Sequence, residues 1–172
     1  MRFIRYQRGS EAPRFGWTFE EHVGPIEGSP LGDYRRLEAD IPIETVKLLA
    51  PVQPGKLLAV GRNYVEHARE PGAEVPELPL IFLKPPSSLL DPGAMIELPP
   101  QSKQVEHEAE LAVVIGRRGR WISAEDSAAY ILGYTIANDV TARDLQRKDG
   151  QWTRAKGFDT LCASTKGENP RS

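Results

Sequence analysis

Two glutamates separated by a single residue, Glu108 and Glu110, lie in the stretch VEHEAELAVVIG, Val105–Gly116, which the pattern predicts to be a buried strand. Alternation along a strand would place both carboxylates on one face, and most other residues of the stretch are apolar. In a buried strand the two ionised groups would lose hydration and repel each other. A hard cation such as Mg²⁺, Mn²⁺ or Ca²⁺ prefers oxygen ligands and would relieve both costs. Alternatively, both glutamates sit at the solvated start of the strand and pair with arginines, an interpretation that this motif alone slightly favours.

A third carboxylate, Asp139, ends the segment Gly133–Asp139, which the pattern predicts to be a strand. The chain has 3 histidines and 1 cysteine, Cys162, so an internal disulfide and a multi-cysteine metal cluster are excluded. Any metal site must therefore rely mainly on carboxylates.

A histidine and a glutamate three residues apart, His67 and Glu70, indicate a possible general base. Asn63 can cap a helix over Tyr64–Glu70, which Pro71 and the following glycine would end. Residues i and i+3 share a helix face, so the carboxylate can hold the imidazole in one tautomer and raise its basicity. The alternative, an exposed ion pair on a surface helix, is common and is favoured by this motif taken alone.

Several cationic and amide side chains follow predicted strands. Lys84 ends the apolar segment Leu80–Leu83, where a lysine can face an anion but more often marks a strand leaving the core. Arg143 and Gln146 are three residues apart in a predicted helical turn, so they point the same way and suit a carboxylate or keto group. Lys156 lies in a segment that precedes a glycine, where it can approach a developing oxyanion.

The charge balance favours a small-molecule ligand. The chain has 24 acidic and 22 basic residues and no basic run, so neither a nucleic-acid surface nor a membrane surface is indicated. Its apolar runs are far shorter than a membrane span, and no secretory apolar segment follows the first residues. Together with the single cysteine, this pattern predicts a cytoplasmic protein.

The elements that must position these residues divide into two units. Residues 1–55 are predicted to form a small N-terminal lobe that begins with a hairpin and ends in the proline-rich linker 51–55. Residues 56–172 carry the candidate chemistry and are predicted to form a catalytic domain. Within them, Ser123 and Asp126 resemble a capping signal for a helix over Ala124–Leu132.

Five ordered motifs resemble the fumarylacetoacetate hydrolase family, and the resemblance extends from about Leu57 to Leu161. These motifs are GRNYVEHARE, IFLKPPSS, VEHEAELAVVIG, GYTIANDVTARDLQ and WTRAKGFD. Each motif alone has an ordinary structural explanation, but their joint occurrence in this order makes the resemblance specific.

The resemblance implies an α+β, mainly β fold, a mixed β-roll or sandwich with short helices, and a homodimer. It implies Mg²⁺ or Mn²⁺, or alternatively Ca²⁺, on Glu108, Glu110 and Asp139. His67 and Glu70 match the family's lid dyad, which activates water or moves a proton, and Lys156 matches the lysine that stabilises an enolate or oxyanion. The positions matched near the substrate are Arg62, Lys84, Arg143 and Gln146.

The implied substrates are 2-oxo or β-diketo acids, such as those of aromatic-compound catabolism. Members cleave a carbon–carbon bond, decarboxylate, or isomerise an enol to a ketone, as with 2-hydroxyhepta-2,4-diene-1,7-dioate. Such an acid can chelate a divalent cation through two oxygens, and the cation stabilises the enolate that leaves. His67, oriented by Glu70, would take a proton from water, while Lys156 would stabilise the charge that builds.

The end of the chain departs from the family pattern. The family continues with further strands beyond WTRAKGFD, whereas residues 163–172 are a polar run without that pattern. We therefore expect a truncated or frame-shifted end and a fold that is incomplete there, with strand edges that favour association. Two functions stay open: a metal-dependent hydrolase, decarboxylase or isomerase, and a non-catalytic remnant that binds a metal or a partner subunit without turnover.

Overall fold

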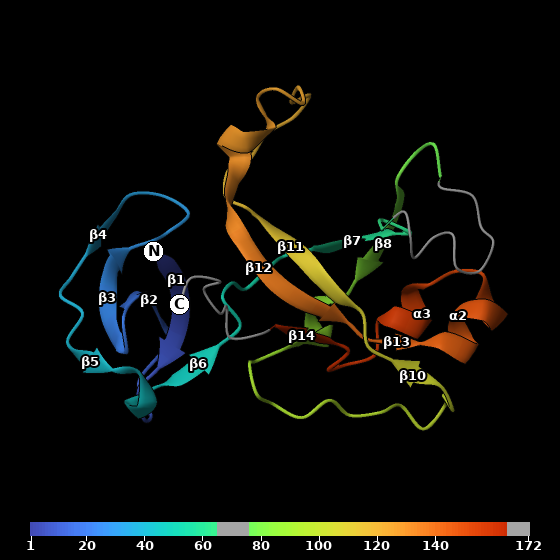
Figure 1. Cartoon of the computed structure of the whole chain (residues 1–172), viewed down its shortest axis with the longest axis horizontal. Coiled ribbons are helices and arrows are strands. Elements are labelled where there is room, and N and C mark those ends of the chain that lie inside the picture. Colours follow the sequence, from blue (N-terminus) through green and yellow to red (C-terminus); the bar gives the residue numbers. More distant parts are fainter. Residues whose placement is uncertain (65–75, 165–172) are drawn as a thin grey trace.

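The computed structural model describes residues 1–64 and 76–164, and strands dominate this part of the chain (Figure 1). The N-terminal sheet has the strand order β4-β3-β2-β1-β6, with β5 paired to β3. Its members are β1 (Arg2–Gln7), β2 (Arg14–Phe19), β3 (His22–Gly28), β4 (Tyr34–Arg36), β5 (Ile41–Pro42) and β6 (Lys47–Leu49), and the 3₁₀ turn η1 (Ile43–Thr45) precedes β6.

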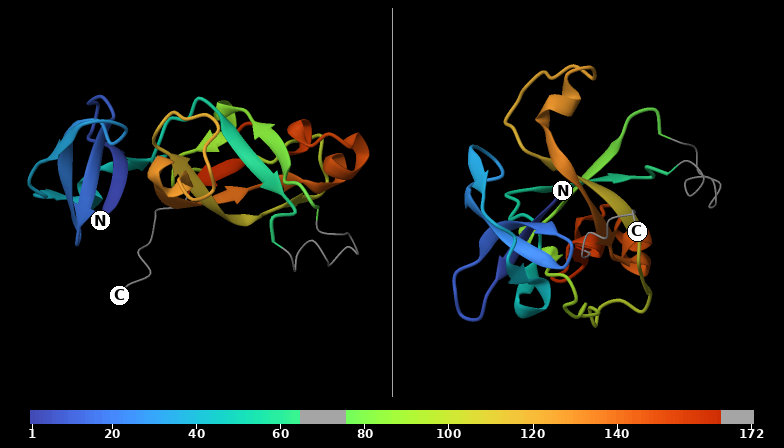
Figure 2. Two further views of the ribbon diagram at one scale, coloured as in Figure 1. Left: turned by 90° about the horizontal axis from the view of Figure 1, so that it is seen from above. Right: turned by 60° about the vertical axis from the view of Figure 1, so that its left-hand side comes forward.

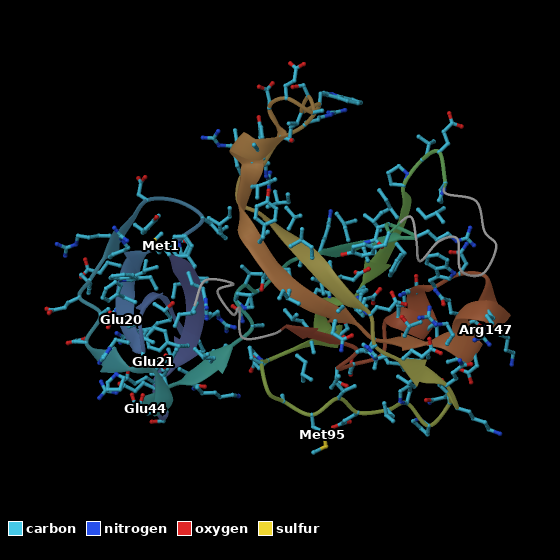
Figure 3. The ribbon with its side chains drawn as sticks, in the orientation of Figure 1. Met1, Glu20, Glu21, Glu44, Met95 and Arg147 are labelled. Carbon is cyan, nitrogen blue, oxygen red and sulfur yellow. The ribbon has the colours of Figure 1, made fainter. Side chains whose placement is uncertain are left out.

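Alternation along β1 produces the core of this sheet. Ile4 and Tyr6 point to the same side and pack with Val23 of β3. Gly16 of β2 is required here, because a Cβ at that position would lie 2.8 Å from the Tyr6 ring. Glu20, Glu21 and Glu44 are exposed on the outside of this part of the chain (Figure 3). The predicted N-terminal hairpin is thus confirmed by the antiparallel pairing of β1 with β2.

Three sheets and two short helices follow among the described residues. The first sheet pairs β7 (Leu57–Gly61) with β8 (Leu80–Lys84), the second has the order β11-β12-β14-β9, and the third pairs β10 with β13. The remaining elements are η2 (Pro86–Ser88), β9 (Leu89–Leu90), β10 (Val105–Glu106), β11 (Ala109–Ile115), η3 (Ser127–Tyr130), β12 (Ile131–Asp139), β13 (Thr141–Ala142), α2 (Arg143–Asp149), α3 (Thr153–Lys156) and β14 (Cys162–Ser164). This is the mainly β, α+β class that the sequence predicts. In the described ranges, no helix has the length and apolarity that crossing a membrane would need.

The two helices carry polar residues to the end of the second sheet. Gly150, in the left-handed region with φ of 69°, ends α2 and lets the chain turn back into α3. Leu145 of α2 and Ala155 of α3 are buried together against Ala142 of β13. This packing fixes Lys156, the last residue of α3, beside β13.

The predicted strand Val105–Gly116 is wrong in two respects. The chain forms two separate strands, β10 and β11, and one face of β11 is exposed instead of buried. Leu111 and Ile115 are 61% and 62% exposed, because nothing among the described residues packs on this side of β11 and β12. The face that carries Glu110 is the one partly covered.

The predicted helix over Ala124–Leu132 is also wrong. The predicted capping contact exists, since the Asp126 backbone N–H donates to the Ser123 hydroxyl at 3.1 Å. However, only the 3₁₀ turn η3 follows, because Ile131 begins β12 and pairs with Ile115 of β11. The segment projects from the body of the molecule as a loop (Figures 1 and 2).

Candidate active site

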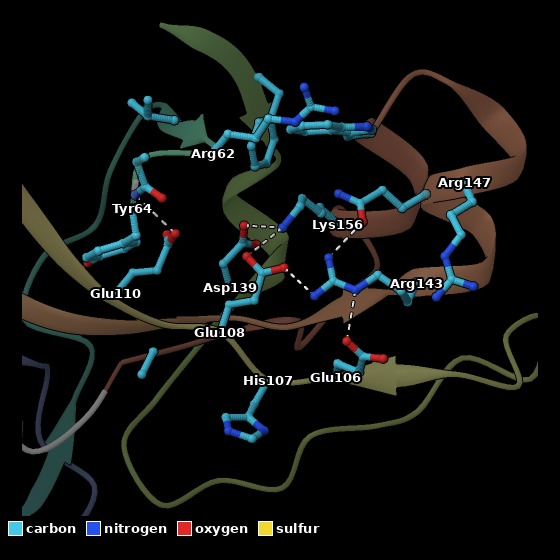
Figure 4. Close-up of a pocket in the computed structure, with 17 residues that line it drawn as sticks. Arg62, Tyr64, Glu106, His107, Glu108, Glu110, Asp139, Arg143, Arg147 and Lys156 are labelled. Carbon is cyan, nitrogen blue, oxygen red and sulfur yellow. Dashed lines mark hydrogen bonds and ion pairs between the residues drawn. The ribbon is translucent and has the colours of Figure 1, made fainter. Parts of the chain in front are cut away.

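Three carboxylates meet where β11 begins and β12 ends. Glu108, Glu110 and Asp139 each offer an oxygen atom, and these atoms all lie within 4.8 Å of one another (Figure 4). Antiparallel pairing of β11 with β12 produces this arrangement, since the Asp139 backbone N–H donates to the Glu108 carbonyl at 2.9 Å. Three oxygen donors at this spacing fit a hard divalent cation.

The ammonium of Lys156 is buried against this cluster. Its Nζ lies 3.1 Å from Glu108 Oε2, 2.7 Å from Asp139 Oδ2 and 2.7 Å from the Thr141 hydroxyl. The Phe82 ring lies under it, with Nζ 5.2 Å from the ring centroid. Lys156 is only 2% exposed, and it lines the pocket in front of the carboxylates.

Lys84 approaches Asp139 from another side. Its Nζ donates to Asp139 Oδ1 and, at 2.9 Å, to the backbone carbonyl of Leu161. Its side chain is 3% exposed and does not line the pocket. The structure therefore places this residue behind a carboxylate of the cluster, whereas the sequence prediction places it near the substrate.

Arg143 and Gln146 lie on the same side of α2, as their spacing predicts, but they contact each other. The guanidinium donates to Gln146 Oε1 at 2.8 Å and to Glu106 Oε2 at 2.9 Å, and it forms an ion pair with Glu108 Oε1 at 2.8 Å. Hydrogen bonds from Arg143 and then from Gln104 hold the pKa of Glu106 below its ordinary value. Arg143 therefore neutralises this side of the cluster.

Neighbouring cations neutralise the three carboxylates to different extents. Burial alone raises the pKa of Glu108, but the charge and hydrogen bond of Lys156, with help from Arg143, outweigh burial and lower it below its ordinary value. Burial, and then the charge of Asp139, raise the pKa of Glu110. The hydrogen bond that Glu110 receives comes from a neutral group, the Asn63 amide, at 3.3 Å. A bound cation would supply the charge that Glu110 needs.

The pocket in front of the cluster has a volume of about 1000 Å³. Its other wall is aromatic and contains Tyr64, Phe82 and Trp152. Phe82 and Trp152 contact edge to face at 5.5 Å between centroids, and Gly61 is required beside them, because a Cβ there would lie 2.1 Å from the Trp152 ring. The pocket thus joins a charged floor to an apolar wall.

Arg62 stands at the mouth of this pocket. It adopts a left-handed backbone conformation, with φ of 53°, which costs free energy for a residue other than glycine. Within residues 1–64 and 76–164 its guanidinium makes no ion pair or hydrogen bond. It is therefore available for an anionic ligand.

Two predicted residues, His67 and Glu70, lie outside the described residues. Conversely, sequence reasoning missed Asn63, Tyr64, Glu106 and Thr141, which line the pocket or contact its charged groups. Only their position inside or beside the five motifs could have indicated them.

Comparison with known proteins agrees with this geometry. Residues 56–166 match the family described as "Fumarylacetoacetate (FAA) hydrolase C-terminal", and residues 1–51 match "Rv2993c-like, N-terminal". The chain belongs to the fumarylacetoacetate hydrolase family. The predicted family resemblance is therefore confirmed.

Relatives in this family include named enzymes. The human mitochondrial protein "Oxaloacetate tautomerase FAHD2A" is 48% identical over 134 residues, which cover 74% of this chain and 43% of the relative. The structure titled as 5-carboxymethyl-2-hydroxymuconate delta-isomerase from Mycobacterium smegmatis has a TM-score of 0.85 and 40% identity, covering 100% of this chain and 68% of that one. The 2-hydroxyhepta-2,4-diene-1,7-dioate isomerase from Mycobacterium marinum has a TM-score of 0.82 and 38% identity, covering 95% and 64%. The chain spans about half the length of the curated relatives that it matches.

Proposed function

We propose that this chain is a divalent-metal-dependent enzyme that acts on a 2-oxo or β-diketo acid. The observation that supports it most is the meeting of Glu108, Glu110 and Asp139 with the buried ammonium of Lys156 at the floor of one pocket. The reaction is enol–keto isomerisation, carbon–carbon bond cleavage or decarboxylation, all of which place negative charge on an enol-type oxygen. Relatives named as a tautomerase and as isomerases favour isomerisation among the three.

The three carboxylates would hold Mg²⁺ or Mn²⁺, because all their ligand atoms are hard oxygens. When bound, the ion would act as a Lewis acid toward the oxygens of the substrate. Lys156 adds a fixed positive charge that faces the same pocket and stabilises negative charge as it develops. Proton transfer is assigned to His67 and Glu70 by the sequence prediction alone.

The function is tested by turnover of oxaloacetate and of acylpyruvates, followed by their ultraviolet absorbance. We expect turnover that EDTA abolishes and that Mg²⁺ or Mn²⁺ restores. Turnover that persists in EDTA would contradict the metal dependence. Binding of Mn²⁺ without turnover of any 2-oxo acid would instead favour the non-catalytic remnant.

Arg62 is proposed to bind the carboxylate of the acid, because it lines the pocket and its guanidinium makes no hydrogen bond or ion pair among the described residues. Replacing it, Arg62→Gln, is expected to raise KM about 10- to 100-fold, the size of a lost charged hydrogen bond, with a smaller effect on kcat. The matched control is Arg117→Gln on the projecting loop, where the guanidinium lies over the Tyr130 ring at 5.9 Å. An unchanged KM in Arg62→Gln would remove Arg62 from the binding site.

The association state, the division of the chain and its compartment also stay proposals. The exposed face of β11 and β12, with Leu111, Val113, Ile115, Tyr134 and Ile136, is apolar and supports a homodimer. A single species of 19.1 kDa in sedimentation velocity would contradict a dimer. The division into an N-terminal lobe, residues 1–55, and a catalytic domain, residues 56–172, remains a prediction. The cytoplasmic location is also a prediction.

A further inference from the structure

Thr141 places a hydroxyl at the centre of the charged cluster, although the proposed mechanism does not use it. This residue begins β13 and is 0% exposed. Its Oγ1 lies 2.7 Å from Lys156 Nζ, 3.0 Å from Glu108 Oε1 and 3.0 Å from the backbone carbonyl of Asp139. Thus one neutral group contacts the cation and two of the acidic residues.

The donors and acceptors determine the direction of these bonds. An ammonium has three N–H groups and no acceptor, and Lys156 has three acceptors: Glu108 Oε2, Asp139 Oδ2 and Thr141 Oγ1. Thr141 must therefore accept from Lys156. Its own single hydrogen is donated either to Glu108 Oε1 or to the Asp139 carbonyl, both at 3.0 Å.

Without this hydroxyl, one N–H of Lys156 would have no partner, and the ammonium could turn toward either carboxylate. Among the described residues, Glu108 Oε1 would then keep its contact with Arg143 alone, at 2.8 Å. Lys156 and Glu108 would each keep their ion pairs, so the charges of the cluster would remain neutralised. The orientations of the Lys156 ammonium and the Glu108 carboxylate would be less restricted. A group that orients metal ligands in this way typically changes metal affinity or activity 10- to 100-fold when it is removed.

We propose that Thr141 is a positioning residue, whose hydroxyl directs the Lys156 ammonium and orients the Glu108 carboxylate toward a bound divalent cation. The inference rests on the proposed function, since it assigns this residue a part in that site. A purely structural role would require only that Thr141 fill its space, which valine does equally well. The two roles therefore differ in what the hydroxyl contributes.

The test compares Thr141→Val, which keeps the volume and removes the hydroxyl, with Thr141→Ser, which keeps the hydroxyl. Mn²⁺ affinity is measured by calorimetry on the full chain, and kcat and KM are measured separately with oxaloacetate. We expect Thr141→Val to weaken Mn²⁺ binding and lower kcat, each about 10- to 100-fold, with KM changed far less. Thr141→Ser should stay within about threefold of the wild type in both.

Three results would overturn the proposal. Wild-type Mn²⁺ affinity and kcat in Thr141→Val would show that the hydroxyl is dispensable. Equal losses in the valine and serine variants would assign the effect to packing around residue 141, since serine keeps the hydroxyl. A lowered Tm with unchanged Mn²⁺ affinity and kcat would show a structural role only. If Thr141→Val fails to fold, Thr141→Ala replaces it under the same criteria.

The inference and the proposed function can fail separately. If the wild type binds Mn²⁺ but turns over no 2-oxo acid, the proposed function is wrong, and the Mn²⁺ affinities of the valine and serine variants still decide the role of Thr141. If the wild type binds no Mn²⁺, both proposals are wrong.

Discussion

Replacing Lys156 by methionine is expected to lower kcat for 2-oxo acid turnover about 10²- to 10³-fold, with a smaller change in KM. Methionine retains most of the side-chain volume but removes the charge that lies 3.1 Å from Glu108 and 2.7 Å from Asp139 in the pocket floor. Loss of one fixed electrostatic contact to developing negative charge typically costs about 3–4 kcal/mol of transition-state stabilisation. Steady-state kinetics at saturating Mg²⁺ would measure this effect.

The chain offers a matched control in Lys84→Met. Both lysines are buried and both pair with Asp139, but only Lys156 lines the pocket. Removing either one leaves a buried carboxylate with one cation fewer, so both variants should lower Tm. Only Lys156→Met should lower kcat strongly, and equal losses of kcat in the two variants would contradict a direct role for Lys156.

Replacing Glu110 by glutamine is expected to abolish the rise in Tm that Mn²⁺ causes and to weaken Mn²⁺ binding by at least about 100-fold. A ligand that binds only the folded state stabilises it in proportion to the logarithm of its concentration over Kd, so the wild type should melt at a higher temperature with Mn²⁺ than with EDTA. Glutamine keeps the shape of Glu110 but loses its charge. An unchanged Mn²⁺ response would remove Glu110 from the metal site.

The same substitution should act in the opposite direction on the metal-free protein. Because burial and the charge of Asp139 raise the pKa of Glu110, its contribution to stability is complete below the ordinary glutamate pKa and is lost as the pH rises through the raised pKa. At neutral pH in EDTA, Glu110→Gln should therefore have a higher Tm than the wild type. Glu106→Gln is the control, since Glu106 pairs with Arg143 outside the carboxylate triad and should leave the Mn²⁺ response in place.

Some features were wrongly predicted because local patterns do not report what packs on them. The alternation in β11 correctly separates its two faces, but an apolar face looks the same in sequence whether it is covered or, as with Leu111, exposed. Likewise the Ser123 hydroxyl accepts the capping hydrogen bond that its spacing predicts, yet pairing of Ile131 with Ile115 ends the helical turn. In both cases a partner from elsewhere in the chain decides the outcome.

The acidic side of the site could be inferred from the chain itself. Alternation in an extended segment is a local property, so the sequence alone places Glu108 and Glu110 on one side, although Glu108 lies just before β11. That Asp139 joins them is implied by the family resemblance. The arrangement of the cationic side required the folded protein. The sequence prediction places both Lys84 and Lys156 near the substrate, but α3 brings only Lys156 to the pocket, with Thr141 of β13 beside it. These contacts join elements that meet only when the sheets and helices pack, and no spacing along the chain specifies them.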